Sequence, residues 1–447
     1  MFYGKLIRRF KQNVSGSDIG QRMVSGISWS LAGTICAKLL LMIANIVVAR
    51  IMGKEMYGEF GMAKSTLNML MIFGSAGLGI TATKYIAEYR NNHPQMASKI
   101  YLVTNVFALV LAFLVAVLVF IFADLISIDI LHAQSLIEPM KVVGCILFFI
   151  VINIAQEGVL SGFEDFKHKS INGVIGNIIQ SILIIVGAYL GGVVGAVCGY
   201  GSGIIVTLIL NKYSINRNFK KIGVIHDIKA LKLSDFKVLY SYSLPAAISS
   251  ILLPTSYWVI RAILVRHTDF NELATYDVAD QWRILVLFIP ATICHIAMPI
   301  LSSIPSDNVK KFKRVLNLNL SLNMGIAVFA SIIMILLSAV IMGFYGEEFT
   351  DTKPFIIMAV SCIFTSASTI LGVSISSKAK MWTWCLTNII WSSVAIGSSY
   401  IFIQMGMGAL GAALGILVSF FTQAIIQYLY MRHLLFVDGK AYNNMDS

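Results

Sequence analysis

Five ionisable residues lie inside long apolar runs of this sequence. They are Lys38, Lys64, Arg261, Asp280 and Arg283. A charge inside a membrane-spanning segment is costly, and by default it faces a partner or a water-filled cavity. Four of the five residues are basic, so the chemistry that they indicate is the binding of an anion. We therefore predict that these residues line a cavity that accepts an anionic substrate.

The five positions do not support this prediction equally. Lys38 lies about mid-way along its apolar run, so its side chain has no short route to a membrane interface. For Lys64 and Arg261, snorkelling to the outer headgroups competes with substrate contact. Asp280 and Arg283 are three residues apart on one helix face, so a simple ion pair is the alternative there. Lys38 is therefore the strongest candidate of the five.

The composition indicates that the apolar runs lie in a lipid bilayer. Hydrophobic residues make up 57% of the 447 residues and charged residues 13%, whereas soluble domains have about 45–50% and about 25%. The net charge of +12 comes from basic residues between the apolar runs rather than from one basic stripe. That placement indicates topology signals and contact with anionic membrane lipids, and it excludes a nucleic-acid partner.

The apolar runs predict an all-α polytopic membrane protein with twelve transmembrane helices. A crossing needs about 20 apolar residues, and the runs that meet this length are 23–49, 58–82, 100–122, 137–160, 170–190, 193–211, 240–265, 279–301, 316–344, 354–376, 382–404 and 407–430. The junctions at 190–193 and 404–407 are tight. Basic residues gather in alternate loops, whereas the loops 123–136 and 345–353 are acidic. The positive-inside rule then places both termini in the cytoplasm.

The chain also repeats itself. Val48-Ala49-Arg50 matches Leu264-Val265-Arg266 at an offset of 216 residues, and Lys64 and Asp280 stand at the same offset. Both halves begin on the same side, so they are parallel repeats. We predict two six-helix bundles around a central cavity. The predicted organisation is a basic N-terminal segment (1–22), the first bundle (23–211), a basic linker (212–239), the second bundle (240–431) and a tail (432–447).

Glycines recur four residues apart between Gly187 and Gly203. This spacing puts small residues on one helix face, and it indicates close helix packing in preference to a gating hinge.

Motifs for covalent or cofactor chemistry are lacking. The sequence has no Walker A motif, and Cys294-His295 has no further ligand near it, so we expect neither ATP hydrolysis nor a metal site. The spans lack the chain of buried acids and histidines that a proton relay would use, which leaves the coupling ion open between H⁺ and Na⁺. We expect no cofactor and no catalytic residue, so the chain is predicted not to be an enzyme.

Three segments resemble a known family. Residues 49–60 (ARIMGKEMYGEF) resemble the signature after the first helix of bacterial polysaccharide and O-antigen exporters. Residues 77–87 (GLGITATKYIA) and 160–166 (LSGFEDF) are similar to two further stretches of that family. It belongs to the multidrug/oligosaccharidyl-lipid/polysaccharide exporter superfamily. The motifs lie mainly in the first half of the chain and are more specific for the superfamily than for the cargo.

The resemblance implies a flippase of the bacterial inner membrane that works by alternating access. It would carry polyprenyl-diphosphate-linked oligosaccharides from the inner to the outer leaflet for O-antigen, capsule or exopolysaccharide biosynthesis. Polysaccharide polymerase machinery is an expected partner. An ion-coupled multidrug antiporter of the same superfamily is the first alternative, and a membrane-embedded glycan polymerase or acyltransferase is the second.

Overall fold

The computed structural model describes residues 18–75, 77–224, 237–305 and 308–443. Most of the predicted N-terminal segment 1–22 therefore lies outside the described residues. The same holds for residues 225–236 of the predicted linker and for residues 444–447 of the predicted tail.

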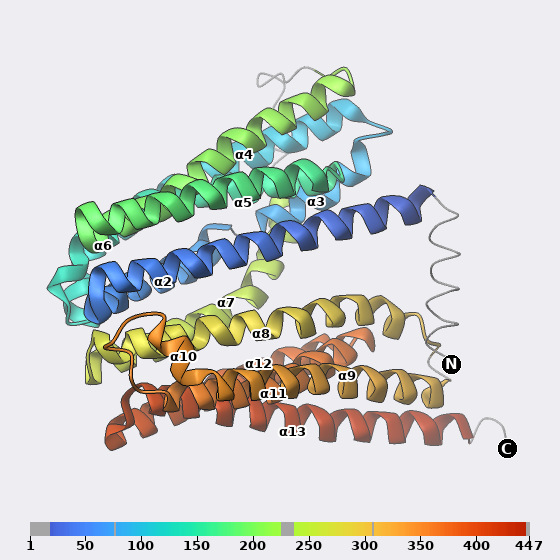
Figure 1. The fold of residues 1–447 in the computed structure, drawn as a ribbon. Helices are drawn as coiled ribbons and strands as arrows, with labels where there is room; N and C mark the ends of the chain where they lie inside the picture. Colours follow the sequence, from blue (N-terminus) through green and yellow to red (C-terminus); the bar gives the residue numbers. More distant parts are fainter. Residues whose placement is uncertain (1–17, 76, 225–236, 306–307, 444–447) are drawn as a thin grey trace. The chain divides into compact units, whose positions relative to one another are not determined.

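All regular structure in the described residues is helical, as the apolar runs predict (Figure 1). The α-helices are α2 (Asp18–Ser75), α3 (Leu78–Tyr89), α4 (Pro94–Ile121), α5 (Ile137–Gly162), α6 (Phe166–Lys221), α7 (Lys237–His267), α8 (Phe270–Ser302), α9 (Val309–Leu336), α10 (Ser338–Gly343), α11 (Lys353–Ser377), α12 (Met381–Phe402) and α13 (Gly408–Asn443). Three short segments complete them: η1 (Leu125–Ile130), η2 (Gln134–Leu136) and η5 (Ile403–Met407). In the described chain, 7 helical stretches are long and apolar enough to cross a membrane. The chain is thus a polytopic membrane protein.

Glycines interrupt the longest of these stretches. Gly53 bends α2 (φ 78°), and Gly192 bends α6 (φ 53°). Gly406 (φ 81°) lies in η5, just before α13. A left-handed φ costs glycine little because it lacks a Cβ atom. The predicted junctions at 190–193 and 404–407 are therefore confirmed as breaks.

The predicted span 58–82 is wrong in its end. The helix stops at Ser75, and α3 begins at Leu78 after Gly77, whose φ is 71°. Hydropathy missed this break because the apolar run continues through it. Each of the twelve predicted ranges nevertheless overlaps a helical segment of the described chain.

Contacts divide the chain into two compact units. Unit 1 comprises Met1–Val48, Thr66–Ser127 and Gln134–Ile248, and unit 2 comprises Ala49–Ser65, Ile128–Ala133 and Ser249–Ser447. Unit 2 thus includes the part of α2 that surrounds Gly53. The six-plus-six boundaries derived from the repeat remain predictions.

In unit 1, α3, α4 and α5 pack together, and α6 lies against α5 (Figure 1). Buried Ile86, Tyr101, Leu160 and Phe219 share one core, with the Tyr101 and Phe219 ring centroids 5.3 Å apart. The two parts of α6 meet through bare backbone: a Cβ atom on Gly195 would lie 2.0 Å from the Gly187 carbonyl oxygen. The packing interpretation of the spaced glycines is confirmed at this contact.

Gly195→Ala is expected to lower the thermal stability of the purified protein. The added methyl group must separate the two parts of α6, and overpacking of this kind costs about 1–3 kcal/mol. A thermal melt in detergent measures the effect. Gly173→Ala is the matched control on the same helix, because a Cβ atom there meets nothing within 4 Å. Equal melting temperatures for the two variants would contradict the close packing.

Asp165 is the N-cap residue of α6 in unit 1. Its carboxylate accepts hydrogen bonds from His168 Nδ1 at 2.6 Å and from Asn218 Nδ2 at 2.8 Å. Burial alone would raise the pKa of Asp165, but the hydrogen bonds from Asn218 and His168 outweigh it and lower the pKa below the ordinary value. The ionised carboxylate therefore stabilises the fold.

Asp165→Asn is expected to lower the melting temperature at neutral pH, with a smaller loss in acid. A carboxyl group with a lowered folded pKa contributes its full stability above the unfolded pKa of about 3.9. That contribution is lost as the pH falls through the folded value. Melts of both proteins from pH 7 to pH 3 should therefore converge at the acid end. A difference that does not change with pH would show that the charge of Asp165 is not what stabilises the cap.

Candidate functional site

Four of the five predicted site residues come together in unit 2. Arg261 lies on α7, Asp280 and Arg283 lie on α8, and Lys64 lies on the part of α2 that belongs to this unit. We call these four residues and Asp277 the ion cluster. Its guanidinium and carboxylate groups are buried: exposed side-chain fractions are 11% for Arg261, 9% for Asp277, 7% for Asp280 and 4% for Arg283.

Arg261 joins two carboxylates of α8. Its Nε donates to Asp277 Oδ1 at 2.8 Å, and its Nη2 donates to Asp280 Oδ2 at 2.7 Å. Asp277 and Asp280 are three residues apart, so one helix face presents both to the planar guanidinium. Snorkelling of Arg261 to the headgroups is therefore wrong, because its charge is used inside the unit.

Arg283 occupies the other side of Asp280. Its Nε donates to Asp280 Oδ1 at 2.8 Å, and its Nη2 donates to the Tyr257 hydroxyl at 3.1 Å. The guanidinium also lies over the Tyr257 ring at 5.4 Å and over the Phe420 ring at 5.8 Å. The predicted pair of Asp280 and Arg283 is confirmed, and it is part of a larger network.

Lys64 approaches the cluster from α2. A Cβ atom on Gly61, one turn before Lys64, would lie 2.0 Å from Asp277 Oδ2, so the Asp277 carboxylate rests against bare α2 backbone. The Lys64 ammonium lies 5.4 Å from the Phe60 ring centroid, and Asp277 and Asp280 are its neighbouring acids. Lys64 is half-buried. Arg261 and Arg283 form direct ion pairs with the carboxylates, whereas Lys64 lies further from them.

Asp277 was missed by sequence reasoning. The predicted eighth span begins at 279, whereas α8 begins at Phe270. Asp277 was therefore treated as lying outside the helix. With Asp277 included, the cluster holds three bases and two acids, so the basic excess is smaller than the five predicted residues indicate. The usable signal was the three-residue spacing of Asp277 and Asp280.

Neutral polar side chains meet at Gln281 and Trp282, which lie between the cluster residues Asp280 and Arg283 in the sequence of α8. The hydroxyl groups of Tyr57 and Tyr345 each lie 3.4 Å from Gln281 Oε1, and Trp282 Nε1 donates to the Tyr345 hydroxyl at 3.1 Å. The Tyr57 and Tyr345 ring centroids are 6.2 Å apart. Both rings are buried, with Tyr57 2% and Tyr345 0% exposed, so their hydroxyl groups fix Gln281 inside unit 2.

Lys38 belongs to unit 1, on the part of α2 before Gly53, and its side chain is half-buried. Its predicted role in a cavity stays a prediction.

The fold is that of transporters of the MOP superfamily. A solved multidrug resistance MATE family transporter of that superfamily, in its inward-facing conformation, matches with a TM-score of 0.78 at 17% identity, covering 90% of this chain and 96% of that one. The lipid II flippase MurJ, in its inward closed conformation, matches with a TM-score of 0.74 at 15% identity, covering 94% of this chain and 91% of that one. At these identities the likeness establishes the fold alone.

The sequence assigns the family within this fold. The family model described as polysaccharide biosynthesis protein matches residues 23–305, so the chain belongs to that family. The EPS I polysaccharide export inner membrane protein EpsE of Ralstonia solanacearum is 23% identical over 206 residues, which are 44% of this chain and 46% of that protein. The chain thus spans slightly less than half the length of this relative. The lipid III flippase of Escherichia coli (strain K12) is 24% identical over 304 residues, which are 64% of this chain and 70% of that protein.

Proposed function

We propose that this protein is a flippase for polyprenyl-diphosphate-linked oligosaccharides. It moves them from the inner to the outer leaflet of the bacterial inner membrane for surface polysaccharide biosynthesis. Alternating access of two six-helix bundles achieves the transfer, without covalent chemistry. The proposal includes twelve crossings with both termini in the cytoplasm, a coupling ion (H⁺ or Na⁺) and a polysaccharide polymerase as partner. The family assignment and the relatives named for polysaccharide export and lipid III flipping support it.

The ion cluster is the observation that carries the proposal. Within the five residues of the ion cluster, three cations and two acids leave one positive charge in excess. A diphosphate that leaves water needs such a charge, because an uncompensated anion is very costly in a low dielectric. The polyprenyl tail can stay in the bilayer, so only the diphosphate and sugars need polar partners. Gln281, which is half-buried and follows Asp280 on α8, offers such a partner.

A multidrug antiporter is the competing function, since MATE transporters share the fold. Cationic drugs call for an acidic site, and the positive excess of the ion cluster argues against this alternative. A glycan polymerase or acyltransferase is the remaining alternative.

Reconstitution separates these functions. Proteoliposomes with the purified protein would receive a fluorescent polyprenyl-diphosphate oligosaccharide in one leaflet, and its appearance in the other leaflet would be measured. We expect flipping of this lipid and no extrusion of ethidium under an H⁺ or Na⁺ gradient. Ethidium extrusion without lipid flipping would establish the antiporter instead. Elongation of the glycan during the assay would establish the polymerase.

Lys38→Ala is expected to impair export while the protein remains in the membrane. The reason is the position of Lys38 mid-way along its span, where a charge requires a polar function. Surface polysaccharide would be measured in a strain that carries only this variant. Lys220→Ala, an exposed position at the end of α6, is the control. A normal amount of surface polysaccharide in the Lys38→Ala strain would show that Lys38 has no role in transport.

A further inference from the structure

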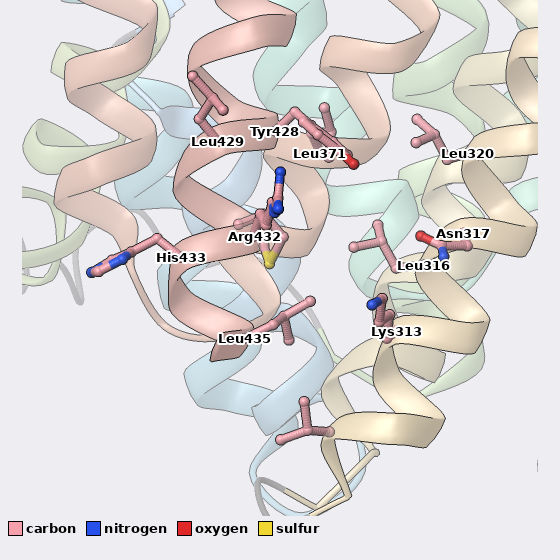
Figure 2. A pocket seen from close by; sticks show the side chains of 12 residues that line it. Lys313, Leu316, Asn317, Leu320, Leu371, Tyr428, Leu429, Arg432, His433 and Leu435 are labelled. Carbon is pink, nitrogen blue, oxygen red and sulfur yellow. The ribbon is translucent and has the colours of Figure 1, made fainter. Parts of the chain in front are cut away.

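A second basic site lies in unit 2, at the ends of α9 and α13. It is a pocket of about 660 Å³ between these helices and α11. This volume lies within the range of about 300–1,000 Å³ that is usual for small-molecule sites. Figure 2 shows Lys313 and Arg432 on opposite sides of it, from α9 and α13. Among the described residues that line the pocket, none is acidic.

Charge and apolar surface are separated along the pocket. Lys313 is near the start of α9, and Arg432 and His433 follow the C-terminal end of the predicted span 407–430. Leu320 follows Lys313 by seven residues, which places it about 10 Å further along the helix axis at about 1.5 Å per residue. Leu371 on α11 and Leu429 on α13 also line the pocket. The basic residues therefore lie near the ends of the predicted spans, together with Val309 and Leu435, whereas Leu320, Leu371 and Leu429 lie deeper.

This order matches one type of molecule. A phospholipid places its phosphate at the boundary and its acyl chain toward the bilayer centre. Basic pockets between transmembrane helices on the cytoplasmic side bind anionic headgroups. Leu429 is 56% exposed, so an acyl chain can lie along it without moving the helices. A soluble phosphate would use the basic end and leave the leucines without a function.

We propose that the pocket between α9, α11 and α13 is a binding site for an anionic phospholipid, with its phosphate on Lys313 and Arg432 and an acyl chain on Leu320 and Leu429. The site is distinct from the ion cluster, and it does not depend on the identity of the cargo. Because three helices of unit 2 line the pocket, a lipid in it stabilises their packing.

Native mass spectrometry of the purified, delipidated full-length protein tests this site. Phosphatidylglycerol or phosphatidylcholine is added at equal concentrations, and bound lipids are counted. We expect the wild type to retain phosphatidylglycerol preferentially. The double variant Lys313→Gln/Arg432→Gln should bind it about thirtyfold more weakly, since each basic residue contributes about fivefold. Lys310→Gln/Lys311→Gln removes two exposed charges from the same helix end outside the pocket, and it should bind as the wild type does.

The apolar part has its own variant. Leu429→Trp fills the pocket without changing charge and should also reduce retention of phosphatidylglycerol. Leu386→Trp, on α12 outside the pocket and 55% exposed, should not. The proposal is overturned if the wild type retains both lipids equally, or if Lys313→Gln/Arg432→Gln and its control bind alike. Displacement of the lipid by equimolar inorganic pyrophosphate would identify a site for free phosphate instead.

Discussion

Asp280→Ala is expected to destabilise the protein by about 3–5 kcal/mol, the usual cost of removing one partner from a buried ion pair. Asp280 accepts hydrogen bonds from both Arg261 and Arg283. Without it, Arg283 keeps the Tyr257 hydroxyl and its ring contacts, and Arg261 keeps the carboxylate of Asp277. Fluorescence-detected gel filtration after heating would show a large loss of folded protein.

An exposed pair provides the control for Asp280→Ala. Lys141 and Glu138 are also three residues apart on one helix. Their N–O distance is 2.9 Å, against 2.8 Å for Arg283 and Asp280, but the Lys141 side chain is 31% exposed and the Glu138 side chain 68%. Glu138→Ala should therefore leave the heating profile almost unchanged. Arg283→Met added to Asp280→Ala should restore part of the lost stability, because it removes the unpaired charge. If the double variant is as unstable as the sum of its single variants, the charge network is not the cause.

The sequence predicts the helices far better than their contacts. Apolar runs and alternating basic loops locate the spans because hydropathy and charge are properties of each segment alone. The break at Gly77 was missed, since its cause is a left-handed backbone inside a run that stays apolar. The tight junction at Gly191-Gly192 was found because one helix through both spans would be twice the length of a crossing.

For the candidate site, too, the sequence predicts the residues better than their contacts. Lys64, Arg261, Asp280 and Arg283 were identified because charges are rare in apolar runs. Their arrangement was only partly predictable: the offset of 216 residues related Lys64 to Asp280, but nothing in the sequence indicated that Gly61 lets Asp277 rest against α2. Asp277 was missed because the predicted eighth span begins at 279, nine residues after the start of α8 at Phe270.

Lys64→Gln is expected to reduce lipid flipping at least about tenfold, equivalent to about 1.4 kcal/mol, with little loss of folded protein. Arg261 and Arg283 bind the two carboxylates directly, so their charges are largely used by the fold. Lys64 supplies the excess charge, and its ammonium is held by longer-range attraction to Asp277. It is therefore the cation that can turn to a diphosphate at the smallest structural cost. Flipping in proteoliposomes measures the effect.

Lys64→Arg distinguishes charge from other properties of this side chain. It keeps the positive charge, so it should retain more flipping than Lys64→Gln, although the longer planar group changes the geometry. Lys353→Gln removes an exposed charge at the start of α11 and should flip lipid as the wild type does. Full activity of Lys64→Gln would mean that the excess charge of the ion cluster does not meet the cargo. The cluster would then be a structural element of unit 2, and the diphosphate would have to meet its positive charge elsewhere, with Lys38 as the next candidate.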